Sequence, residues 1–207
     1  MNRKEEIILT TLELAAENGL GSVSMAQIAE KLGIKKPSLY NHFKSKDEMI
    51  NEMYRFLREE TWEKTKDIEL DDSSFLDDNS LEDILLEKVS QYNRFVADKR
   101  MMHFFKVLYS ERATNPLAAQ MMVEETNRMI LAIKNLFHAL AVHGKLKCEN
   151  VDMAATSYAM TIHSMMDYQI DCMGLNAGSF QNSTMIQEYI KWFSRQIGGC
   201  ENEKDID

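Results

Sequence analysis

Side chains that carry positive charge are concentrated between Lys31 and Lys46, a stretch with five lysines and neither Asp nor Glu. The chain as a whole is acidic, with 24 Lys and Arg against 33 Asp and Glu and a net charge of -9. A locally basic segment in an acidic protein favours contact with a specific polyanion. The alternative is a solvated helix face, which is the usual role of a lysine run. The elements that position these lysines decide between the two.

Two short helices joined by a tight turn are predicted around this stretch. Ser24 and Gln27 have the spacing of a capping box at the start of the first helix. Gly33 suits the left-handed position that ends a helix, and Pro37 fits the first turn of the next one. This pattern is typical of a helix-turn-helix, whose second helix enters the major groove of DNA.

The second helix has one apolar and one polar side. Leu39 and Phe43, spaced i and i+4, would pack it on the first helix. Lys36 on the other side can donate to guanine O6 and N7, and Asn41 can read adenine or another base edge. Ser24, at the start of the first helix, is a candidate for a phosphate contact.

The segment resembles the DNA-binding domain of the TetR family of bacterial transcriptional regulators. The residues that match the family pattern are Ser24, Ile28-Ala29, Gly33-Ile34, Leu39-Tyr40, His42-Phe43, Lys46 and Ile50. The resemblance implies that Tyr40, His42 and Lys46 touch backbone phosphates, although His42 fits equally well as a half-buried packing residue. The expected DNA-binding residues are Ser24, Lys35, Lys36, Pro37, Ser38, Tyr40, Asn41, His42 and Lys46.

Composition indicates an all-α protein. Two prolines and eight glycines in 207 residues leave long uninterrupted segments. We expect no signal peptide at the start of the chain, and no apolar run reaches the ~20 residues of a membrane span. The three cysteines are widely spaced, which suits reduced thiols in the cytoplasm, and without a C-x-x-C pair we expect neither a metal nor a cofactor.

About nine helices are predicted, forming an N-terminal three-helix head and a C-terminal helical bundle. Beyond the helix-turn-helix they cover residues 3–18, a helix from 45 onward, 81–97, 100–109, 115–143, 150–173 and 183–197. We assign residues 1–46 to a DNA-binding domain and 47–198 to a ligand-binding and dimerisation domain, with 47–65 as the connecting helix. The acidic segment 66–80 is interpreted as a solvated linker, and 199–207 as a polar tail.

The C-terminal bundle is rich in methionine and aromatic residues. Such residues on a helix usually form core, but methionine also suits a deformable ligand cavity. The resemblance implies a small-molecule pocket there, for an effector that is at least partly hydrophobic. The candidate pocket residues are Tyr92, Met102, Phe105, Tyr109, Met122, Met129, Phe137, Tyr158 and Met165.

The last two predicted helices are apolar on nearly all sides, which is typical of helices buried on nearly all sides. A two-fold, four-helix interface between two chains would bury them, and the resemblance implies the same homodimer. A dimer supplies two recognition helices for the half-sites of a palindrome. The candidate interface residues are Met160, Ile186, Tyr189, Ile190, Phe193 and Ile197.

The sequence thus favours a TetR-type transcriptional repressor that binds a palindromic operator as a dimer and is released by a small-molecule effector. An enzyme is not expected, because the chain has no G-x-S-x-G, no E-x-x-H pair and no phosphate-binding loop. The alternative is an architectural DNA-binding protein or an activator without small-molecule control.

Overall fold

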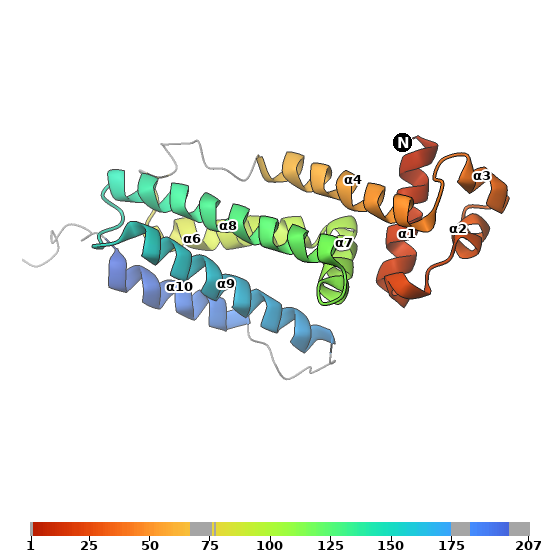
Figure 1. Ribbon diagram of the computed structural model, residues 1–207. Helices are drawn as coiled ribbons and strands as arrows, with labels where there is room; N and C mark the ends of the chain where they lie inside the picture. The colour runs from red at the N-terminus through yellow and green to blue at the C-terminus, as the bar shows by residue number, and fades with distance from the viewer. Residues whose placement is uncertain (1, 67–75, 77, 175–182, 199–207) are drawn as a thin grey trace, which may run out of the picture. The chain divides into compact units, whose positions relative to one another are not determined.

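The computed structural model describes residues 2–66, 76, 78–174 and 183–198 of the 207-residue chain (Figure 1). Across these residues there are nine α-helices and one 3-10 helix, and the only β pairing is an isolated bridge between Leu146 and Gly198. The predicted all-α class is confirmed. The elements are α1 (Arg3–Asn18), η1 (Leu20–Ser22), α2 (Met25–Lys31), α3 (Lys36–Tyr40), α4 (Lys46–Lys66), α6 (Leu81–Val96), α7 (Lys99–Glu111), α8 (Pro116–Val142), α9 (Val151–Gly174) and α10 (Ser183–Ile197). The predicted linker 66–80 lies largely outside the described residues, and the predicted tail 199–207 entirely.

Side-chain caps fix where the long helices begin. The Asn115 side-chain oxygen accepts hydrogen bonds from the backbone N–H groups of Leu117 at 3.0 Å and Ala118 at 3.4 Å. The Asn150 side-chain oxygen accepts one from the N–H of Met153 at 2.9 Å. These bonds satisfy N–H groups that have no partner inside the helix. The predicted starts of α8 and α9 are therefore confirmed.

The predicted range 100–109 is too short for α7. Asp98 caps this helix, because its side-chain oxygen accepts hydrogen bonds from the N–H groups of Arg100 at 3.1 Å and Met101 at 3.2 Å. The helix therefore starts at Lys99, and it continues to Glu111.

The helices form two compact units. The first comprises Met1–Ile68 with Tyr92–Glu125, and the second comprises Glu69–Gln91 with Thr126–Asp207. Division into packing units does not test the predicted functional division at residue 46, which stays a prediction.

The first unit contains the three-helix head. Its core joins α1, α2, α3, α4, α7 and the start of α8, and α1 contacts α2, α4 and α7. The fully buried side chains include Ile7, Ile28, Leu39, Met53 and Phe104, each 0 % exposed. The head therefore shares one continuous core with the connecting helix α4 and with α7.

The second unit is organised by an aromatic cluster from α8, α9 and α10. The Tyr158 ring centroid lies 5.4 Å from that of Phe137, 5.1 Å from that of Phe193 and 6.1 Å from that of Tyr189. Tyr158 and Phe137 are buried at 2 % and 0 % exposure. These rings hold the three helices together.

Candidate nucleic-acid interface

The tight turn between α2 and α3 follows from a capping box and a glycine. The Ser24 hydroxyl accepts a hydrogen bond from the Gln27 N–H at 3.3 Å, and the Gln27 side-chain oxygen accepts one from the Ser24 N–H at 2.8 Å. At the other end Gly33 has a φ of 64°, which an L side chain rarely adopts. The Ile34 N–H then donates to the Ala29 carbonyl at 2.9 Å. The predicted helix-turn-helix geometry is present.

The helix α3 has the expected buried and exposed sides. Leu39 and Phe43 are 0 % and 1 % exposed, so they anchor the motif in the core of the first unit. Tyr40 is 47 % exposed, although it neighbours Leu39. Of the predicted DNA-binding residues, Lys35, Lys36, Pro37, Tyr40, Asn41 and His42 are exposed together around α3, while Ser38 is half-buried.

The recognition helix is shorter than the sequence pattern suggested. It ends at Tyr40, so Asn41 and His42 lie in the turn that follows instead of on the helix. The N–H groups of His42 and Phe43 both donate to the Leu39 carbonyl, at 2.9 and 3.0 Å, and this tightening brings Phe43 into the core. Because His42 is exposed, the alternative role of a half-buried packing residue is not what the structure shows.

Lys46 has protein partners for its ammonium group. Its Nζ donates hydrogen bonds to the Leu20 carbonyl at 3.0 Å and the Gly21 carbonyl at 3.3 Å. Both carbonyls belong to η1, just before α2, so the start of α4 is tied to the chain that leads into the helix-turn-helix. An ammonium has three donors, and the predicted phosphate contact therefore has one N–H left for it.

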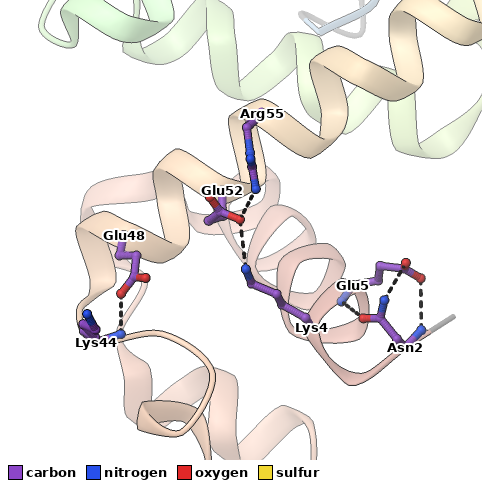
Figure 2. Close-up of polar contacts among 7 residues, drawn as sticks. All are labelled: Asn2, Lys4, Glu5, Lys44, Glu48, Glu52 and Arg55. Atoms are coloured by element: carbon purple, nitrogen blue, oxygen red, sulfur yellow. Dashed lines mark hydrogen bonds and ion pairs between the residues drawn. The ribbon is translucent and has the colours of Figure 1, made fainter.

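A network of charged groups joins α1 to α4, as Figure 2 shows. Lys4 Nζ lies 3.0 Å from a carboxylate oxygen of Glu52, and Arg55 pairs with the same oxygen. The hydrogen bond from Lys4, assisted by Arg55, holds the pKa of the Glu52 carboxyl below its ordinary value against the opposing effect of burial. Lys4 Nζ also lies 5.3 Å from the ring centroid of Phe43. Lys4 therefore contacts both α4 and Phe43, which is buried just after α3.

A second acidic residue joins three helices. Glu13 on α1 lies 3.0 Å from Lys31 Nζ on α2 and 3.4 Å from Lys99 Nζ on α7. The hydrogen bond from Lys31, followed by the charge of Lys31 and the contact with Lys99, lowers the pKa of Glu13. Lys31 is therefore held by the protein, and the basic side chains exposed near α3 are Lys35, Lys36 and Lys44.

The start of α4 is capped by Ser45 and also carries the acidic residue Glu48. The Lys44 backbone N–H donates to a carboxylate oxygen of Glu48 (Figure 2), and the Glu48 N–H donates to the Ser45 hydroxyl at 3.0 Å. The predicted Ser45 cap is present. The Glu48 carboxylate reaches Lys44 and not the Ser45 N–H, so only half of the predicted capping box forms.

The predicted effector-pocket residues divide between the two units. In the first unit are Tyr92, Met102, Phe105, Tyr109 and Met122, and in the second are Met129, Phe137, Tyr158 and Met165. In the first unit, Tyr92 and Phe105 both pack on Phe95, each with 6.3 Å between ring centroids. Met102 is 48 % exposed and faces solvent.

The predicted interface residues of α10 are mostly buried within the single chain. Ile186, Ile190 and Phe193 are 4 %, 0 % and 7 % exposed, because they pack inside the second unit. The apolar surface still open on α9 and α10 comes from Met153, Met160, Tyr168 and Trp192, which are 43–64 % exposed. The α10 stripe that the sequence pattern singled out is therefore the inner face of that helix.

The described ranges hold neither a membrane-spanning helix nor a cluster of metal ligands. No helix there is long and apolar enough to cross a membrane. No group of three or more His, Cys, Asp and Glu side chains in the same ranges is placed to hold a metal ion.

Known family patterns match both parts of the chain. The family model described as "Bacterial regulatory proteins, tetR family" matches residues 7–53. A second model, "AefR-like transcriptional repressor, C-terminal domain", matches residues 83–193, which is more than half of the chain.

Individual relatives are similar in sequence over the head and in fold over nearly the whole chain. The HTH-type transcriptional repressor KstR2 of Mycolicibacterium smegmatis is 37 % identical over 54 residues, which are 26 % of this chain and 26 % of that protein. The chain thus matches about a quarter of that relative's length. A tetR-family regulator structure from Mesorhizobium loti MAFF303099 has a TM-score of 0.68 at 17 % identity, covering 96 % of this chain and 100 % of that chain. A transcriptional regulator from Saccharomonospora viridis, solved in complex with choline, has a TM-score of 0.66 at 16 % identity, covering 95 % and 98 %.

Proposed function

Because this chain belongs to the TetR family of bacterial regulatory proteins, we propose that it represses transcription by binding a palindromic DNA operator as a homodimer. A small-molecule effector, at least partly hydrophobic, releases it from the operator. Bacterial DNA as its target places its action in the cytoplasm. The observation that carries the proposal is the exposed basic and polar surface around α3, supported by a buried Leu39 and Phe43.

The surface around α3 divides into base-reading and phosphate-binding groups. Lys36 lies in the first turn of α3, and the N-terminal residues of a recognition helix are the ones that contact base edges. Asn41 directly follows α3 as its C-cap and offers a carboxamide suited to adenine. We assign phosphate contacts to Tyr40, His42, Lys35 and the third N–H donor of Lys46. Pro37 and Ser38 are assigned to van der Waals contact with the groove.

The homodimer is proposed to form through the outer faces of α9 and α10. Met160 and Trp192 are 45 % and 57 % exposed, so both helices present a large apolar side chain on their outer faces. The Trp192 ring lies 5.9 Å from that of Tyr189, which is half-buried like Ile197. Ile186, Ile190 and Phe193 then support the interface from beneath.

The effector is proposed to bind among the methionine and aromatic side chains of the C-terminal bundle. Support comes from the repressor C-terminal family model over residues 83–193 and from the structural neighbour that holds choline. A quaternary ammonium ligand is one that aromatic side chains bind well. The pocket candidates predicted from the sequence stay candidates, except that the exposure of Met102 argues against it.

Selection of bound DNA from random oligonucleotides by the full-length protein tests the proposal. We expect enrichment of one dyad-symmetric sequence whose two half-sites are separated by about one or more helical turns, roughly 34–36 Å for each turn. A ligand library is then screened for compounds that release the enriched duplex. Failure to enrich a dyad would refute the operator-binding dimer, and enrichment without any releasing compound would favour effector-independent binding.

A further inference from the structure

The capping box at the start of α2 leaves Ser24 without a free proton. The Ser24 hydroxyl donates its only proton to the Gln27 side-chain oxygen at 2.8 Å and accepts the Gln27 N–H. A phosphate contact from Ser24 would therefore require breaking the bond that starts the helix. Another group must supply any side-chain contact with DNA at this end of α2.

Gln27 itself has that group. Its side-chain oxygen accepts hydrogen bonds from both the N–H and the hydroxyl of Ser24, each at 2.8 Å. Since a backbone N–H can only donate, the oxygen of the carboxamide has to face Ser24, and the planar amide then directs Nε2 the other way. Among the described residues Nε2 has no hydrogen-bond partner, and the side chain is exposed. Two N–H donors are thus held in a fixed orientation at the surface.

In the first turns of α2, no side chain other than Gln27 offers a hydrogen-bond donor to a phosphate. Met25, Ile28 and Ala29 are buried in the core of the first unit. Ala26 has no polar group, and Glu30 would repel a phosphate. Lys31, at the last turn, pairs with Glu13 on α1.

We propose that Gln27, through its Nε2 amide, binds a backbone phosphate of the operator, while Ser24 acts as a positioning residue that orients the amide. In a helix-turn-helix the first helix crosses the DNA backbone, where phosphate contacts fix the register of the second helix. The two hydrogen bonds to Ser24 hold the amide in place before DNA arrives, so binding orders little more of the side chain. This assignment rests on the proposed DNA-binding function.

The substitutions Gln27→Glu and Gln27→Ala separate this role from a purely structural one. Gln27→Glu retains the oxygen that Ser24 needs, and Glu is a normal capping-box residue, but it replaces the two donors with a negative charge. Gln27→Ala removes both the cap and the donors without adding charge. Asn93→Asp, at an exposed position of α6, is the control for the change in net charge.

Each variant of the full-length protein is measured for thermal stability and for binding, by fluorescence anisotropy, to the selected operator and to an unrelated duplex of the same length. We expect the melting temperature of Gln27→Glu to equal or exceed that of the wild type and that of Gln27→Ala to be lower. Affinity should follow a different order, with Gln27→Ala weaker than the wild type and Gln27→Glu weakest, by about tenfold or more on both duplexes. Asn93→Asp should bind like the wild type.

Wild-type affinity of Gln27→Glu, or affinity above that of Gln27→Ala, would overturn the inference and leave Gln27 as a helix cap alone. A loss of affinity on the operator only would also overturn it, because a phosphate contact carries no sequence information. A wild-type protein that binds no duplex overturns the proposed function itself, which is a separate result.

Discussion

The substitution Lys46→Ala tests how the connecting helix is attached to the DNA-binding head. It removes the ammonium that donates to the Leu20 carbonyl at 3.0 Å and the Gly21 carbonyl at 3.3 Å. Lys46→Arg is the matched control, because a guanidinium can donate to both carbonyls. An effect that appears in Lys46→Ala but not in Lys46→Arg is due to the loss of these bonds and of the positive charge.

The expected loss of stability is modest. A hydrogen bond from a charged donor contributes about 1.5–3 kcal/mol when buried, but one of these bonds is part-buried and the other exposed. Screening by solvent therefore reduces the sum to roughly 1 kcal/mol. For a chain of this size, that lowers the melting temperature by about 2–4 °C. Differential scanning calorimetry of both variants without DNA measures the shift.

The same variant separates a phosphate contact from a positioning role. If the third N–H reaches a phosphate, Lys46→Ala weakens binding to all duplexes alike and reduces the slope of log affinity against log salt by about 0.9. Titrations at four salt concentrations on the operator and an unrelated duplex give both quantities. An unchanged melting temperature would refute the bridging role. Altered sequence preference with an unchanged salt slope would refute the phosphate contact.

Four further substitutions have defined outcomes. Asn41→Ala should relax preference at one base position and cost about 1–3 kcal/mol of operator affinity, measured by competition among operator variants, and an equal loss on all variants would contradict base reading. Trp192→Glu should give folded monomers in sedimentation velocity, since this side chain is 57 % exposed, and a fully dimeric variant would remove α10 from the interface. Tyr158→Phe should leave stability in urea unchanged or raise it by up to about 1 kcal/mol, because the buried hydroxyl has no hydrogen-bond partner among the described residues, and a clear loss would reveal a partner. Because the pKa of Glu52 is lowered in the folded protein, its ionised carboxylate stabilises the fold above the ordinary pKa of 4.5, and this stabilisation is lost as the pH falls through the lowered pKa. The stability of the wild type in urea should therefore fall more between pH 5 and pH 3 than that of Glu52→Gln. An equal fall for the two proteins would contradict the ion pair between Lys4 and Glu52.

The local pattern of the sequence was sufficient for most of the helices and for the caps of α2, α8 and α9. Asn115, Asn150 and Ser24 act on N–H groups two or three residues away, so the sequence contains all that is needed to place them. The recognition helix was predicted too long, because the chain turns after Tyr40 and Phe43 then packs in the core of the first unit. A tertiary contact of that kind has no sequence signature at Asn41 or His42.

Contacts between distant segments could not be predicted. Glu13 and Lys99 are 86 residues apart, and Lys4 and Glu52 are 48 apart, so only the packing of α1 on α4 and α7 reveals them. The side of α10 that packs inside the chain could not be chosen from the sequence for a related reason. Ile190 and Trp192 are both apolar, but Ile190 is buried while Trp192 is 57 % exposed.

The number of protomers on the operator tests the central claim most directly. Mass photometry on a duplex with an intact dyad, and on one with a single half-site scrambled, counts the bound chains and compares their affinities. We predict two protomers on the intact duplex and a large loss of affinity when either half-site is scrambled. A single protomer that binds both duplexes equally well would contradict a dimeric operator-reading regulator.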